Sequence, residues 1–157
     1  MTMTFENSRT KENLMKAFAG ESQARNRYSF AASQSKKENL YVISAVFKFT
    51  AKQEKEHAEI FYNHLAQMAG ENIAIDGTYP VDITPSIIEL LRYAEHNEME
   101  EYGDVYKHFA EVAKKHTNGT KLVGFFTGHI YGMTLDFGVQ TSYNRLDKIV
   151  SNINRNC

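Results

Sequence analysis

Acidic and histidine side chains occupy positions where a helix bundle ordinarily buries apolar residues. Read at alternating steps of three and four residues, one helical face consists of Leu40, Ile43, Phe47, Thr50, Glu54, His57, Phe61, His64 and Met68. A later face consists of Ile87, Leu91, Ala94, Glu98, Glu101, Val105, Phe109 and Val112. Burying a carboxylate without a partner costs on the order of several kcal/mol. Since a cation would compensate these charges, the pattern predicts a metal site inside a helical bundle.

The composition excludes several classes of protein. The 157 residues include 18 basic and 19 acidic side chains, a formal net charge of -1, so we expect no nucleic-acid or membrane surface. The single cysteine, Cys157, rules out an internal disulfide or a CxxC metal site within these residues. No apolar run approaches the roughly 20 residues that span a bilayer, and the first residues lack a secretory pattern. We expect a soluble, cytoplasmic protein with a single domain over residues 1–157.

The first half of the chain predicts two helices and a crossover. One helix spans about residues 8–36, with Glu21 on its inward face, and the next spans about residues 39–68 and ends before Gly70. Residues 69–84 contain glycine and proline and have no helical periodicity. This segment therefore predicts a long connection.

The second half predicts two more helices. The third runs from an N-cap at Thr84 to about residue 115. Glycine is frequent in residues 117–157, but the three-four rhythm continues there from Leu122 to Ile153, which predicts a fourth helix. Two helices, one long crossover and two further helices form the topology of an all-α, ferritin-like four-helix bundle.

The acidic and histidine residues match the ligand pattern of carboxylate-bridged metal pairs. Such bundles take one Glu from each of two helices and a Glu-x-x-His from each of the other two, because side chains three residues apart project from one face. The chain offers a lone Glu21, the pair Glu54 and His57, and the pair Glu98 and Glu101. Oxygen ligands with an imidazole favour iron or manganese over copper or structural zinc.

The sequence around these residues closely resembles the rubrerythrins, the peroxide-reducing diiron proteins of anaerobes and microaerophiles. The matching runs are AFAGESQARNRY (17–28), QEKEHA (53–58) and EMEEY (98–102). The resemblance covers about residues 8–116, within the family-like part of the chain, residues 1–116. The resemblance implies iron ligation by Glu21, Glu54, His57, Glu98 and Glu101, with Tyr28 and Tyr102 near the cluster in supporting roles. It also implies two non-haem iron ions, with manganese or zinc as possible substitutes, and reduction of hydrogen peroxide to water in oxidative-stress defence.

The chain departs from the family in two places. These residues hold no four-cysteine rubredoxin domain, so electrons would come from a separate rubredoxin-like or flavoprotein carrier. The second Glu-x-x-His of the family would fall near residues 131–136, which read YGMTLD in a divergent fourth helix. His129 and Asp136 lie on the predicted inward face there, but seven helical residues separate them by about 10 Å, too far to bind one iron. Asp136 is the better candidate, and a purely structural role for both stays open.

Two functions remain open from the sequence. The first is a diiron peroxidase that acts as a homodimer or larger assembly. The second is a non-enzymatic, helical metal-binding or subunit-interaction protein whose fourth helix leaves the diiron site incomplete. Iron content separates them, because the enzyme requires two irons per chain.

Overall fold

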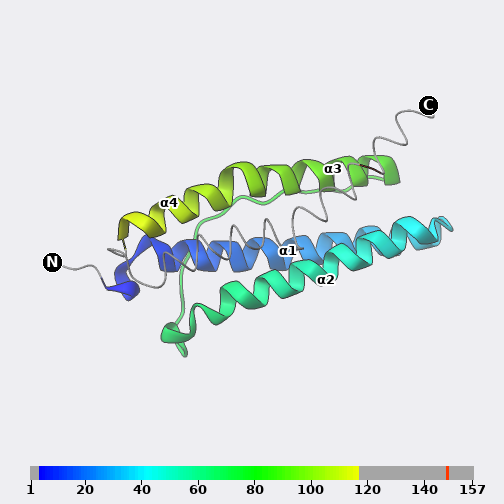
Figure 1. Cartoon of the computed structure of the whole chain (residues 1–157). Coiled ribbons are helices and arrows are strands. Elements are labelled where there is room, and N and C mark those ends of the chain that lie inside the picture. Colours follow the sequence, from blue (N-terminus) through cyan, green and yellow to red (C-terminus); the bar gives the residue numbers. More distant parts are fainter. Residues whose placement is uncertain (1–3, 117–147, 149–157) are drawn as a thin grey trace.

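The computed structural model describes residues 4–116 and residue 148, and within them every regular element is helical (Figure 1). The elements are the 3-10 turns η1 (Phe5–Asn7) and η2 (Ala66–Met68), the α-helices α1 (Arg9–Lys37), α2 (Tyr41–Asn63), α3 (Ile87–Glu100) and α4 (Tyr106–His116), and the π-helix η3 (Glu101–Val105). None of the described helices is both long and apolar enough to cross a membrane. The fourth helix of the predicted bundle falls on residues 117–157, outside the described residues apart from residue 148.

Helices α1 and α2 form an antiparallel pair joined by a tight turn (Figure 1). The hydroxyl of Ser8 accepts a hydrogen bond from the Lys11 amide at 3.2 Å and so caps the start of α1. Asn39 ends the pair's first helix with φ of 62°, a left-handed conformation that asparagine tolerates, and the Leu40 amide donates to the Ser35 carbonyl at 2.9 Å. The helix pair predicted from the sequence is confirmed, although α2 ends at Asn63 and only the turn η2 continues to Met68.

Helices α3, η3 and α4 follow one another without a break and run along α1 (Figure 1). Helix α3 begins two residues later than predicted, because Ser86 rather than Thr84 is its N-cap. The Ser86 hydroxyl accepts from the Glu89 amide at 3.3 Å, while the Thr84 hydroxyl accepts from the Ser86 amide at 3.2 Å. Thr84 therefore shapes the approach to the helix.

The π-helix η3 changes which residues face the core after Glu101. An unbroken α-helical seam predicts Val105 and Phe109 on the inward face, but Val105 is 39% exposed. Tyr106 and Ala110 are buried instead, at 4% and 5% exposure. A π-turn inserts one residue into the helical repeat, so the inward face after it is displaced by about one residue. Val112, also predicted to face inward, stays buried at 9% exposure.

The crossover between α2 and α3 is fastened to the helices by polar contacts. Arg27 of α1 forms an ion pair with Asp82, and the Asn97 side chain of α3 donates to the same Asp82 oxygen at 2.9 Å. Nearer to η2, Lys16 and Asp76 form an ion pair at 2.6 Å. These contacts hold the crossover against α1 along the length of the bundle (Figure 1).

The apolar core forms two clusters with a polar layer between them. One cluster includes Ala24, Tyr28, Ala31, Ala32, Phe47, Ala51, Ile87, Leu90, Leu91 and Ala94. The other includes Leu14, Ala17, Phe61, Leu65, Tyr106, Ala110 and Ala113. Glu21, Glu54 and Glu98 lie at the sequence positions between the two clusters on α1, α2 and α3, and all three are almost fully buried. The fold therefore places carboxylates in the middle of the bundle, where burial is most costly.

Candidate metal centre

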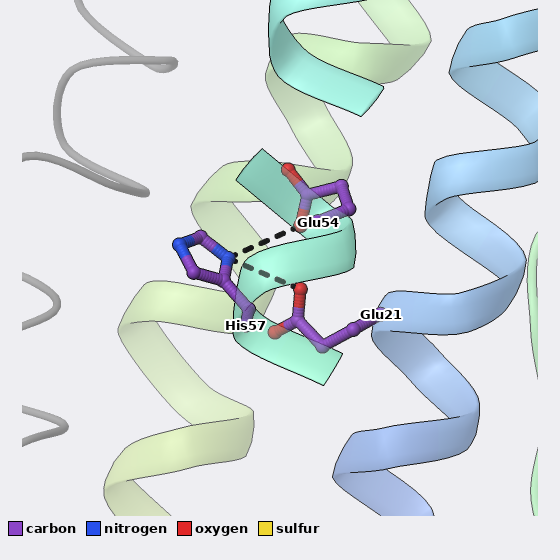
Figure 2. A group of neighbouring side chains, drawn as sticks. All are labelled: Glu21, Glu54 and His57. Atoms are coloured by element: carbon purple, nitrogen blue, oxygen red, sulfur yellow. Dashed lines mark hydrogen bonds and ion pairs between the residues drawn. The ribbon is translucent and has the colours of Figure 1, made fainter. Parts of the chain in front are cut away.

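Two helices bring Glu21, Glu54 and His57 together in the polar layer. Glu21 comes from α1, and Glu54 and His57 lie three residues apart on one face of α2 (Figure 2). Their ligand atoms, one from each residue, all lie within 4.8 Å of one another. All three side chains are buried, so this group has the composition and spacing of a metal site.

His57 connects the two carboxylates. Its Nδ1 lies 3.3 Å from Oε2 of Glu21 and 3.3 Å from Oε2 of Glu54 (Figure 2). Burial by itself lowers the pKa of His57, but the hydrogen bond and negative charge of Glu21 outweigh burial and raise it. The surroundings of His57 thus favour its protonated, positively charged form.

The pKa values of the two carboxyl groups, Glu21 and Glu54, are shifted in opposite directions. Burial alone would raise the pKa of Glu21, but hydrogen bonds with Glu54, His57 and Tyr106 lower it below its ordinary value. The pKa of Glu54 is raised well above its ordinary value by burial and by the negative charges of Glu98 and Glu21. The surroundings of the metal-free site thus favour the charged form of Glu21 and the neutral form of Glu54.

Glu98 contributes a third buried carboxyl group, from α3. The hydroxyl of Tyr28 donates to its Oε1 at 2.7 Å. Burial raises the pKa of Glu98 to about 7, although the Tyr28 hydrogen bond works in the opposite direction. Tyr28 thus contacts a predicted ligand directly, as its predicted supporting role requires.

Tyr106 contacts the site, and the sequence interpretation missed it. Its buried hydroxyl donates a hydrogen bond to Oε1 of Glu21, whereas His57 contacts the other oxygen, Oε2. The interpretation named Tyr102 instead, which lies in η3 and whose side chain is outside the described part of the structure. The signal that identifies Tyr106 is a second helical face, Tyr106, Ala110 and Ala113, one residue out of step with the face that was chosen.

The remaining predicted ligands are placed differently. Glu101 opens the π-helix, is partly exposed, and has its pKa raised well above the ordinary value, first by burial and then by the charges of Glu21 and Glu98. The charges of Glu98 and Glu101 interact with that of Glu21. Neither residue belongs to the group whose ligand atoms lie within 4.8 Å of one another. His129 and Asp136 are outside the described residues.

The donor set fits a divalent cation. Within the described part of the chain, Oε1 of Glu54 and Oε2 of Glu98 are buried without any hydrogen-bond partner. Buried carboxylate oxygens nearly always have a hydrogen-bond partner or bind a cation. A metal ion bound here would contact these two oxygens and compensate their charge. Carboxylate oxygens with one imidazole suit iron or manganese.

Buried carboxylates and a histidine between the helices of a bundle define the class of carboxylate metal-binding bundles. The sequence profile described as Rubrerythrin matches residues 12–125, and the chain belongs to the rubrerythrin family, with its ferritin-like fold. The predicted family and fold class are confirmed.

Relatives named rubrerythrin span many organisms. The rubrerythrin of Porphyromonas gingivalis is 45% identical over 115 residues, which cover 73% of this chain and 56% of that protein. The rubrerythrin of Clostridium perfringens is 41% identical over 111 residues, 70% of this chain and 57% of that protein. That of Nitratidesulfovibrio vulgaris is 38% identical over 112 residues, 71% of this chain and 57% of that protein. The chain thus spans little more than half the length of these relatives.

Proposed function

We propose that this protein is a non-haem diiron peroxidase that reduces hydrogen peroxide to water in defence against oxidative stress. The observation that carries the proposal is the buried group of Glu21, Glu54 and His57, whose ligand atoms lie within 4.8 Å of one another. Membership of the rubrerythrin family supports the same assignment. A buried site in a helical bundle also limits access of water to the reacting atoms.

Five residues would hold the iron: Glu21, Glu54, His57, Glu98 and Glu101. A ferrous pair held by them would supply the two electrons that, with two protons, reduction of hydrogen peroxide to two water molecules requires. Asp136 is the candidate that completes the site from the fourth helix, with His129 as the weaker candidate. Residues 117–157 would then form the last helix of a single domain that includes the whole chain.

The phenols orient the carboxylates in this proposal. Tyr28 donates to Glu98, and Tyr106 donates to Glu21, so each fixes one oxygen of a ligand and leaves the other available. The pKa of each phenol is raised well above its ordinary value, by burial and then by the neighbouring glutamates. In the metal-free protein both hydroxyls therefore keep their protons and act as hydrogen-bond donors to the carboxylates.

Electrons would reach the site from outside these 157 residues. The 157 residues contain one cysteine, so they offer no four-cysteine iron site of their own. We propose a rubredoxin-like or flavoprotein carrier as donor to a homodimer or larger assembly. Steady-state peroxide consumption should be slow with NADH alone and rise when a reduced carrier is added; equal rates with and without the carrier would contradict this proposal.

The competing function is a helical metal-binding or subunit-interaction protein with an incomplete site. It is favoured by the sequence YGMTLD at 131–136, where the family would supply a second Glu-x-x-His. Metal analysis of protein purified without oxygen tests the choice. About two irons per chain and stoichiometric peroxide reduction support the enzyme, whereas one iron or none supports the competing function.

A further inference from the structure

A cavity of about 510 Å³ lies beside the candidate metal centre. Helix α1, the crossover, the end of α3, and the segment formed by η3 and α4 line this cavity, which is partly open at the surface. Its apolar wall includes Ala17 and Gly20 of α1, Pro80 of the crossover, and Val105 and Phe109. The cavity therefore offers an apolar surface next to a polar, buried centre.

Tyr106 lies between the cavity and the candidate metal centre. Tyr106 lines the cavity, and its hydroxyl donates to Oε1 of Glu21. The other oxygen of Glu21 lies 3.3 Å from Nδ1 of His57. Glu101 lines the same cavity from the start of η3. A molecule in the cavity is thus separated from the carboxylate–histidine group by a single side chain.

The cavity is far larger than hydrogen peroxide requires. A water molecule occupies about 30 Å³ of liquid, so a molecule with two oxygen atoms needs roughly 60 Å³. The volume of about 510 Å³ falls instead in the range of pockets that bind organic ligands, roughly 300–1,000 Å³. The walls, which are mainly apolar, match a hydrocarbon group better than water.

We propose that the cavity binds the organic group of an alkyl or aryl hydroperoxide and that the protein reduces such compounds as well as hydrogen peroxide. This inference rests on the proposed diiron peroxidase. In the reaction the O–O bond of ROOH breaks, two electrons from the ferrous pair and two protons are taken up, and ROH and water are released. The one-electron carrier protein then restores the ferrous state. The hydroperoxide end lies toward Tyr106 and Glu101, and the organic group lies against Val105 and Phe109.

The crossover side of the cavity is defined by Tyr79. A Cβ atom at Gly77 would lie 3.0 Å from the Tyr79 hydroxyl oxygen, a tight contact that the tyrosine side chain would have to relieve by a small shift. The hydroxyl donates to the Lys16 carbonyl at 3.4 Å. Across from it, a Cβ atom at Gly20 would meet only Cε1 of Tyr79, at 3.9 Å, an ordinary contact. Position 20 can therefore carry a side chain that grows into the cavity.

Binding of cumyl alcohol to the metal-free protein tests the cavity without any turnover. Cumyl alcohol is the product that cumene hydroperoxide would give, and it cannot be reduced further. We expect NMR titration to show binding, with NOEs from the alcohol to Val105 and Phe109. Gly20→Ala should keep binding, and Gly20→Leu should weaken it at least about tenfold. Gly103→Leu is the matched control, because Gly103 lies outside the cavity and a Cβ atom there meets nothing within 4 Å.

The outcomes separate this inference from the proposed function. Absence of NOEs in the wild-type protein, or equal binding by folded Gly20→Leu, would overturn the cavity assignment. If Gly20→Leu does not fold, the wild-type NOEs decide alone. With ferrous protein in single-turnover experiments, the ratio of rates for cumene hydroperoxide and hydrogen peroxide should fall about tenfold in Gly20→Leu and stay constant in Gly103→Leu. Reduction of hydrogen peroxide without alcohol binding refutes this inference alone, whereas alcohol binding without reduction of either peroxide refutes the proposed function.

Discussion

Replacing Tyr106 by phenylalanine removes one hydroxyl group from the candidate centre and leaves the aromatic ring in place. The ring packs against Phe61 at a centroid distance of 5.4 Å and against Phe109 at 6.2 Å, contacts that phenylalanine also makes. The hydroxyl is the donor to Oε1 of Glu21. A hydrogen bond to a charged group contributes about 1.5–3 kcal/mol. If Glu21 is a ligand, losing this donor should weaken iron binding by about 10–100-fold, or roughly 1.4–2.7 kcal/mol.

The assay is anaerobic titration of the metal-free protein with ferrous iron against a competing chelator, together with the thermal midpoint. Tyr62→Phe is the matched control, because Tyr62 lies on α2 and is 57% exposed, away from the centre. Iron affinity should fall in Tyr106→Phe and stay at the wild-type value in Tyr62→Phe. Wild-type affinity in a folded Tyr106→Phe protein would refute the reasoning that Tyr106 positions a metal ligand.

Three further predictions concern charge. In the metal-free protein burial raises the pKa of Glu98 from 4.5 to about 7, so between these pH values the folded chain keeps a proton that the unfolded chain has lost. The free energy of unfolding should therefore fall by about 3 kcal/mol as pH rises through this range. Urea unfolding at about pH 4.5 and about pH 8 checks this, and a flat profile contradicts it. Asp82→Ala should lower the free energy of unfolding by about 3–5 kcal/mol, because the Arg27 side chain is only 13% exposed and would lose the carboxylate that pairs with its charge. A loss below about 1 kcal/mol in urea unfolding would show that the ion pair is dispensable. Asp136→Ala should lower iron stoichiometry more than His129→Ala does, and metal analysis that finds wild-type iron in Asp136→Ala would show that the fourth helix supplies packing only.

The candidate centre was predictable from the sequence because helical spacing carries the information. Glu21, Glu54 and His57 fall on inward faces at alternating steps of three and four residues, and the structure brings these three together. The side chains on either side of them in the same faces are buried and, apart from Thr50, apolar. Charge within an otherwise apolar face is thus a reliable signal for a site in the middle of a bundle.

The face of the helix after Glu101 was not predictable in the same way. Both Val105 with Phe109 and Tyr106 with Ala110 form acceptable helical faces, so the side-chain pattern allows two registers. The π-helix decides between them through a change in backbone hydrogen bonding, which leaves no distinct pattern in the side chains. For this reason Tyr106 was missed although its hydroxyl contacts Glu21.

The cavity was likewise hidden from the sequence. It depends on how the crossover packs on α1, and the ion pair of Arg27 with Asp82 joins residues far apart in the chain. Such contacts have no periodicity, and the crossover itself is recognisable only as a segment without helical spacing. The sequence therefore indicated where the connection lies but not what it encloses.

Anomalous X-ray diffraction at the iron absorption edge, on crystals of protein purified without oxygen, tests the central claim most directly. Our account predicts two adjacent iron peaks in the polar layer, one of them in contact with Glu21, Glu54 and His57. It also predicts that the peak beside these residues disappears in Glu54→Gln crystals, while the helices stay in place. Iron-replete crystals with no anomalous peak between Glu21 and His57 would contradict the account.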